Sequence, residues 1–226
     1  MANKISHDTL RKFSLFQDFT AVDLLEIQKM LRYKAVEKDE ILLLEGDLSN
    51  HLIFVENGWF KSEKTSKEGR QQTLRFIGPM EVINEYSVFT DEPNAATIIA
   101  MEKAEIFYLI KSDVESLLNR SSSFSRAVIL NLAKRIQILL NHVENLSLYS
   151  VEQRLARYLL EEAKDDIVSR QPWKTQAEIA AHLGTVMDVV NRILQKFERQ
   201  GLILISRKQF KILDQEGLRA ITEKFE

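Results

Sequence analysis

The feature that most constrains this chain is a regular apolar stripe within residues 124–146. Apolar residues recur there at alternating steps of three and four, at Ile129, Leu132, Ile136, Leu139, Val143 and Leu146. Such heptad spacing predicts one long helix whose narrow seam packs against a second helix as a coiled coil. We therefore expect residues 121–147 to form a dimerisation helix that joins two copies of the chain. The alternative is a helix that packs on a domain of its own chain.

The residues before this helix change from helical to strand-like patterns. Thr20 can cap a helix within residues 1–31. From residue 32 to 110, short apolar or alternating runs are separated by turn residues, which predicts a β-sandwich or barrel. Asn57-Gly58 suits a tight hairpin because both residues tolerate positive φ. Lys111-Ser112-Asp113 then opens a short helix, with Ser112 or Asp113 as its cap. We expect residues 1–120 to form one domain.

Residues 173–213 have the pattern of a helix, a tight turn and a second helix. The stretch Thr175-Gln-Ala-Glu178 is a capping box that opens the first helix, and Gly184 ends it. Thr185 is expected to cap the second helix, and two β runs around Arg207-Lys208-Gln209 follow. This order predicts a winged helix-turn-helix within residues 148–226. A further capping box at Ser150 begins this domain and places a hinge at residues 146–150.

The polar side of the second helix carries groups that can read DNA bases. The N-terminal half of such a helix reaches base edges in the major groove. Arg192 can bind guanine bidentately, Asn191 can pair with adenine, and Asp188 can accept from cytosine. The predicted base-reading residues are Met187, Asp188, Asn191 and Arg192. The predicted contacts to the DNA backbone are Thr175, Gln176, Thr185, Lys196, Arg199, Arg207 and Lys208.

The distribution of charge favours DNA as the partner of this domain. The chain has a net charge of −2, but residues 151–211 hold eleven Lys and Arg against eight Asp and Glu. A local positive excess on an acidic protein is typical of a polyanion site. The alternative is a winged helix that docks a protein, in a ligand-binding interaction module.

Several classes of function are excluded by composition. The chain has no cysteine, so disulfides, thiolate zinc sites and cysteine-bound iron–sulfur clusters are ruled out. The four histidines form no pair at metal-ligand spacing, and no metal site is expected. No grouping of nucleophile and base indicates an enzyme. No apolar run is long enough for a membrane span, and the N-terminal residues lack a signal-peptide core, so we expect a cytoplasmic protein.

Taken together, these segments resemble the CRP/FNR family of bacterial regulators over nearly the whole chain. The most specific match is Gly184-Thr-Val-Met-Asp-Val-Val-Asn-Arg192, followed by Ile-Leu-Gln-Lys-Phe-Glu-Arg-Gln-Gly-Leu-Ile. The resemblance implies an α+β fold with an N-terminal double-stranded β-helix (a jelly-roll-like β-roll), a long dimerisation helix and a C-terminal winged helix-turn-helix. It also implies a homodimeric, sequence-specific transcription regulator that binds a palindromic DNA site, contacts RNA polymerase and responds to a small-molecule effector in the β-roll.

The resemblance places the effector pocket at Asn84, Glu85, Ala95, Ala96, Leu139 and Leu140. Family members that bind cAMP have a glycine-glutamate pair and, ten residues after the glutamate, an arginine-serine pair that holds the phosphate. This chain has Asn84-Glu85 and Ala95-Ala96, and two alanines cannot replace a charge-assisted grip on a phosphate. We therefore expect an apolar pocket and an effector other than cAMP. Heme, with His142 on the long helix and no assured ligand, an apolar or anionic metabolite, and no effector at all stay open.

Overall fold

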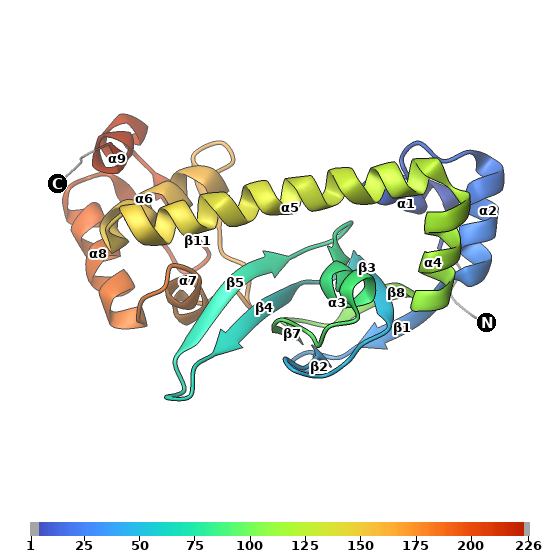
Figure 1. Cartoon of the computed structure of the whole chain (residues 1–226). Coiled ribbons are helices and arrows are strands. Elements are labelled where there is room, and N and C mark those ends of the chain that lie inside the picture. The colour runs from blue at the N-terminus through green and yellow to red at the C-terminus, as the bar shows by residue number, and fades with distance from the viewer. Residues whose placement is uncertain (1–4, 224–226) are drawn as a thin grey trace. The chain divides into compact units, whose positions relative to one another are not determined.

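The structure, a computed structural model, describes residues 5–223, and these residues form two compact units. The N-terminal unit holds residues 5–68 and 74–137, and the C-terminal unit holds residues 69–73 and 138–223. The long helix α5, Ser122–Leu148, contributes residues to both units (Figure 1). The predicted fold class, a β-roll with a long helix and a winged helix-turn-helix, is confirmed. Among residues 5–223, every helix is either too short or too polar for a transmembrane span.

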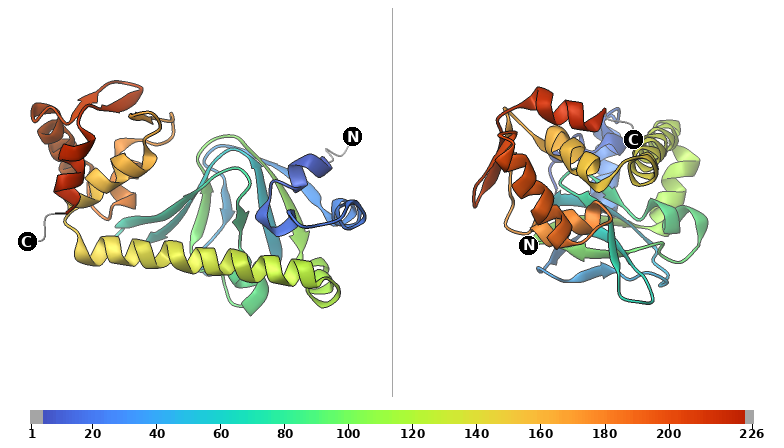
Figure 2. Two further views of the ribbon diagram at one scale, coloured as in Figure 1. Left: turned by 90° about the horizontal axis from the view of Figure 1, so that it is seen from above. Right: turned by 90° about the vertical axis from the view of Figure 1, so that its left-hand side faces the viewer.

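Two four-stranded antiparallel sheets form the β-roll of the N-terminal unit (Figure 2). The first sheet has the order β1-β8-β3-β6, with β1 at Arg32–Val36, β8 at Ala104–Ile110, β3 at His51–Asn57 and β6 at Val82–Ile83. The second has the order β2-β7-β4-β5, with β2 at Ile41–Leu43, β7 at Thr97–Ala100, β4 at Phe60–Thr65 and β5 at Gln71–Ile77. Apart from β4 and β5, which follow one another along the chain, neighbouring strands in each sheet are separated in sequence, so most pairings of the roll are long-range.

The continuous apolar run of β3 is explained by burial on both of its faces. Ile53 and Val55 belong to the core shared between the two sheets. Leu52 and Phe54, which point the other way because strand side chains alternate, belong to a second core under the helices. All four side chains are at most 3% exposed. The first sheet is therefore the central layer of the unit.

The helices of the N-terminal unit cover this second core. They are α1 (His7–Leu10), a 3-10 turn at Ser14–Phe16, α2 (Ala21–Met30), α3 (Glu85–Thr90) and α4 (Lys111–Arg120). Thr20 caps α2, as predicted, and the structure adds that Asp23 completes a reciprocal capping box. The predicted cap of α4 is wrong, because the helix already begins at Lys111 and its N-cap residue is Ile110.

The expected hairpin at Asn57-Gly58 is also wrong. These residues connect β3 to β4, and the two strands lie in different sheets. Gly58 does have the expected positive φ, 86°. A Cβ atom at this position would lie 2.5 Å from the Cβ of Ala104, so glycine is needed both for its conformation and for the close approach of β8.

The C-terminal unit contains the helix-turn-helix and a three-stranded sheet. Its elements are α6 (Val151–Glu162), β9 (Ile167–Ser169), α7 (Gln176–His182), α8 (Met187–Arg199), β10 (Ile203–Ile205), β11 (Gln209–Ile212) and α9 (Gln215–Thr222). Ser150 caps α6 in a capping box with Gln153. The sheet order is β10-β11-β9, so β9 adds to the predicted β10–β11 wing a third strand that the sequence patterns did not indicate.

Candidate nucleic-acid interface and effector cavity

The helix α8 is held by its apolar face, which leaves a polar face outside. Val190, Ile193, Leu194 and Phe197 are buried in one core with residues of α6, α7 and α9. The turn before α8 needs Gly184, whose φ is 68°, in the left-handed region that closes helices. Alternation of buried and exposed positions along one helix therefore determines which side chains are free to contact a partner.

The four predicted base-reading residues lie in the first half of α8. Met187 is 45% exposed, and Asp188 and Arg192 are also exposed. Asn191 is half-buried, and its Oδ1 has no hydrogen-bond partner within the described residues. The structure thus brings the four residues together on neighbouring turns of one helix.

The predicted helix cap between α7 and α8 is displaced by one residue. Val186, not Thr185, is the N-cap of α8, and it makes no side-chain cap bond. The backbone N–H of Thr185 donates instead to the carbonyl of Ala180, at 2.9 Å. Thr175 does cap α7, since its hydroxyl accepts from the Glu178 N–H at 3.3 Å. The Thr185 hydroxyl is therefore not used as a cap.

The residues predicted to contact the DNA backbone differ in whether their side chains are already bonded within the chain. Arg207 and Lys208 are exposed in the turn between β10 and β11. The Arg199 guanidinium donates to the carbonyl of Gln195 on its own helix. Lys196 is bonded to both carboxylate oxygens of Glu152 at 2.7 Å, so its charge is partly neutralised before any phosphate arrives. Two further predicted contacts, Thr175 and Gln176, lie at the start of α7, and Thr185 lies in the turn before α8.

The predicted dimer seam is largely exposed along α5. Ile136, Leu139 and Val143 are 57–59% exposed, and Ile129 is 65% exposed. A row of large apolar side chains in water is costly and marks a surface that associates. Leu132 differs from the others, because it is half-buried and packs on the core of the N-terminal unit. One of the six predicted seam residues is thus shared with its own chain's core.

A cavity of about 140 Å³ lies in the N-terminal unit where the effector pocket was expected. Asn84, Glu85, Ala95 and Ala96 line it, as predicted from the resemblance. Leu139 and Leu140 do not; both are more than half exposed. We expected an apolar cavity, but Arg75, Ser62 and Asn94 also line it, so the lining is partly polar. No histidine is among its described lining residues.

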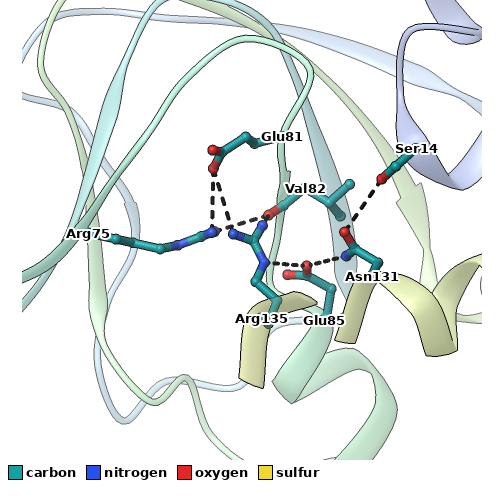
Figure 3. A network of polar contacts seen from close by, with 7 residues as sticks. All are labelled: Ser14, Arg75, Glu81, Val82, Glu85, Asn131 and Arg135. Atoms are coloured by element: carbon teal, nitrogen blue, oxygen red, sulfur yellow. Dashed lines mark hydrogen bonds and ion pairs between the residues drawn. The ribbon is translucent and has the colours of Figure 1, made fainter. Parts of the chain in front are cut away.

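A buried network of charged and polar groups connects this cavity to α5 (Figure 3). Glu85, 8% exposed, accepts from Asn131 Nδ2 at 2.9 Å and from Arg135 Nε at 3.3 Å. The Arg135 Nη2 donates to the carbonyl of Val82 at 2.7 Å. Burial raises the pKa of Glu85, and a hydrogen bond to its own backbone, the charge of Arg75 and the hydrogen bond from Asn131 offset part of that effect. Asn131 and Arg135 therefore occupy hydrogen-bonding sites of Glu85.

The second cation of the network comes from strand β5. The Arg75 guanidinium donates to the Val82 carbonyl at 3.2 Å and lies 3.4 Å from Glu81 Oε2. Arg135 Nη1 is 3.7 Å from the same carboxylate oxygen. Burial lowers the pKa of Arg75 and raises that of Glu81. Sequence reasoning did not identify Arg75, Glu81, Asn131 and Arg135 as residues of this site. The one local signal for the network is that Asn131 and Arg135 are polar and lie one helical turn apart on α5.

The fold and these sites define a winged helix-turn-helix protein with a β-roll of the cyclic-nucleotide-binding type. Residues 33–121 match the family model of the cyclic nucleotide-binding domain, and residues 153–221 match that of the Crp-like helix-turn-helix domain. Together the two models match well over half of the chain. The chain belongs to the CRP/FNR family of DNA-binding transcription regulators, as the resemblance predicted.

Relatives in sequence span nearly the full length of this chain. A probable transcriptional regulator flp of Lacticaseibacillus casei is 25% identical over 219 residues, covering 95% of this chain and 98% of the relative. A CRP-like cAMP-activated global transcriptional regulator of Mycobacterium tuberculosis is 23% identical over 217 residues, covering 93% of this chain and 97% of the relative. The family and the domain order are therefore shared, while the effector of one relative is not thereby the effector of this chain.

Solved structures share the fold. FixK2 of Bradyrhizobium japonicum superposes with a TM-score of 0.75 at 19% identity, covering 87% of this chain and 99% of the other. A CooA mutant of Carboxydothermus hydrogenoformans superposes with a TM-score of 0.74 at 20% identity, covering 91% and 97%. At these identities the likeness supports the fold alone.

Proposed function

We propose that this regulator acts as a homodimer that binds a palindromic DNA site and is controlled by an effector other than cAMP. The observation that carries the proposal is the polar side of the first half of α8, where Asp188 and Arg192 are exposed next to the half-buried Asn191, so that an acceptor, a guanidinium and an amide lie on neighbouring turns. These are the groups that distinguish base pairs in the major groove. Arg207 and Lys208 in the wing supply phosphate contacts, which set the register.

Pairing of two copies through α5 explains the exposed seam. Association buries the side chains of Ile136, Leu139 and Val143, and each large apolar side chain buried contributes about 1.5–3 kcal/mol. A two-fold axis through this seam relates the α8 helix of one copy to that of the other. The two recognition helices then read half-sites about 34 Å apart. A dimer of this kind requires a palindromic operator, and we expect it to contact RNA polymerase when bound.

The residues of the effector cavity do not fit cAMP. Ala95 and Ala96 offer no side-chain donor to a phosphate, and the cation that lines the cavity, Arg75, is already engaged by Val82 and Glu81. The volume of about 140 Å³ is below the roughly 300 Å³ typical of pockets for drug-sized ligands. The effector is therefore a compact molecule with polar groups that compete for Glu85 or Arg75.

The proposed control of DNA binding by the effector depends on Asn131 and Arg135, which lie on α5 and bond to Glu85. An effector that bonds to Glu85 or Arg75 releases or strengthens their contacts to α5, and α5 also carries the dimer seam. The effector thereby shifts the population of α8 arrangements across the dimer, provided that it binds one arrangement more tightly.

Selection of duplex DNA from a random pool by the purified full-length protein tests the proposed function. We expect enrichment of an inverted repeat, and an affinity for it that falls steeply as salt is raised from about 50 to 200 mM, because several phosphates are contacted. Recovery of no duplex sequence at low salt, or binding without a salt slope, would contradict the proposal. Addition of cAMP should leave the melting temperature unchanged, and a shift of several degrees would refute the assignment of the cavity.

A further inference from the structure

The C-terminal unit has a small cavity of its own, formed by three helices. Its volume is about 40 Å³. The last turns of α5, together with α6 and the end of α7, supply the lining residues, which are His142, Asn145, Leu146, Arg154, Arg157, Tyr158, Glu161, His182 and Leu183. Most of these side chains are polar or charged, which is unusual for a cavity between packed helices.

Four polar atoms around this cavity are buried and lack a hydrogen-bond partner within the described residues. They are His142 Nε2, Asn145 Oδ1, Arg154 Nε and Tyr158 OH. Tyr158 as a whole is only 6% exposed. Native proteins pair more than about 90% of their buried polar groups, because each unpaired group costs about 1–3 kcal/mol. Four such atoms from four residues around one cavity indicate that something outside the chain pairs with them.

The chemistry of these atoms specifies an occupant that accepts hydrogen bonds and carries negative charge. Arg154 Nε can only donate, and Tyr158 OH and the imidazole Nε2 can both donate. Asn145 offers its amide N–H instead of its oxygen when the side chain is turned over. Arg154 takes part in none of the ion pairs found among residues 5–223, so its charge is not neutralised there. Burial, and after it the charge of Arg154, lower the pKa of His142, as expected beside an uncompensated cation.

Other charges near the cavity do not reverse this preference. The second arginine, Arg157, lies over the ring of Tyr149, with 4.4 Å from its Cζ to the ring centroid. The one carboxylate in the lining, Glu161, is outnumbered by the guanidinium groups of Arg154 and Arg157, and burial raises the pKa of Glu161. No three His, Cys, Asp or Glu side chains gather at a metal-binding distance in the described part of the chain. A cation is therefore disfavoured.

We propose that this cavity binds a small oxyanion of the size of inorganic phosphate, held by Arg154, Tyr158, His142 and Asn145. A volume of 40 Å³ corresponds to about three water molecules, at roughly 10–15 Å³ each. That is room for one tetrahedral oxyanion or a small carboxylate, and it is too little for a nucleotide. The site is separate from the cavity of the N-terminal unit, since the two share no lining residue.

An oxyanion in this position bridges helices that precede and follow the segment 146–150. His142 and Asn145 belong to α5, whereas Arg154 and Tyr158 belong to α6. Bound anion therefore fastens α6, and with it the helix-turn-helix, to the end of the dimerisation helix. This regulatory consequence rests on the proposed function, but binding itself does not, and it is measured without DNA.

The test uses full-length protein labelled with ¹³C at the histidine ring carbons, because the chain has only four histidines. Sodium phosphate is added at constant ionic strength against sodium chloride. We expect the ring signals of His142 and His182 to shift and saturate with a dissociation constant of about 1 mM or tighter, while those of His7 and His51 stay in place. Separate titrations use sulfate and a phosphomonoester such as glucose 6-phosphate. Competition by glucose 6-phosphate would extend the site to phosphorylated metabolites, and its failure to bind would restrict the site to free oxyanions.

Two variants separate this site from nonspecific anion binding. Tyr158→Phe removes one donor and keeps the ring that lies 5.1 Å from the Lys174 ammonium; it should weaken phosphate binding at least about tenfold, the effect of one hydrogen bond to a charged group. Tyr33→Phe removes a hydroxyl in the N-terminal unit, one that donates to Glu105, and should change nothing. The proposal is overturned by no saturable shift, by equal shifts of all four histidines, or by wild-type affinity in Tyr158→Phe. DNA binding can persist or fail independently of each of these results.

Discussion

His182 should make the C-terminal unit lose stability as the solution becomes acidic. This residue ends α7, and its ring centroid lies 5.5 Å from that of His142. Burial, and after it the charge of His142, lower the pKa of His182 from 6.5 to about 4. The folded state therefore holds the neutral imidazole, while the unfolded chain takes up a proton below its ordinary pKa.

The sign and the size of the effect follow from these two pKa values. The stabilising contribution is fully present above pH 6.5, and it is lost as the pH falls toward 4. The total loss is about 3 kcal/mol, at 1.36 kcal/mol for each pKa unit, and about 2 kcal/mol is already lost at pH 5. A single domain commonly has only about 5–15 kcal/mol in all, so the loss should be easy to measure.

The assay is urea unfolding followed by the fluorescence of Trp173, in a Trp59→Phe background that leaves one tryptophan in the chain. Buffers without phosphate keep the cavity of the C-terminal unit out of the measurement. The same titration on His182→Gln removes the titrating group, and the difference between the two pH profiles isolates its contribution. His7→Gln is the matched control and should follow the parent profile.

Equal pH slopes for His182→Gln and its parent between pH 7 and 5 would refute this reasoning. Such a result would mean that His182 is hydrated or protonated in the folded state. If stability instead increased as the pH fell, carboxylates whose pKa is raised in the folded state would be responsible.

Three other perturbations have defined outcomes. Replacing Ile136 and Leu139 together by Asp should give a monomer by light scattering, since both are exposed seam residues, and a persisting dimer would place the interface elsewhere. Arg192→Ala should lower the preference for one base per half-site by about 1–3 kcal/mol of binding free energy, whereas Arg207→Ala should weaken binding to all sequences alike. Unchanged base preference in Arg192→Ala would contradict the base-reading role. Glu85→Gln should destabilise the N-terminal unit by about 1.5–3 kcal/mol, because it removes one of the two carboxylates beside the Arg135 guanidinium, and an unchanged melting temperature would contradict this.

Periodic patterns predicted the helices and their faces well. The stripe from Ile129 to Leu146 gave one long helix, and the spacing of α7, Gly184 and α8 gave the helix-turn-helix. Local signals also found the caps at Thr20 and Ser150, since a capping box depends on residues only three apart. Where the local signal was ambiguous, as at Thr185 and at Ser112, the predicted cap was wrong.

Non-local pairing limited what could be predicted of the β-roll. Asn57-Gly58 has the local chemistry of a hairpin, yet its two strands enter different sheets, because β3 pairs with the distant strands β8 and β6, whereas β4 pairs with β7 and β5. For the same reason the effector cavity looked apolar in the sequence. Arg75 reaches it from β5, and Arg135 reaches Glu85 from α5, fifty residues away along the chain.

The sequence alone determined the family, the apolar stripe of α5 and the polar face of α8, because the last two depend on residues close together along one helix. Only the tertiary structure decided that Leu132 leaves the seam for its own core, that Lys196 is paired with Glu152, and that Glu85 is bonded from α5. It also gathered His142, Asn145, Arg154 and Tyr158 around one cavity. The physical reason is that burial and the pairing of charges depend on distances in space, which sequence spacing does not fix between separate elements.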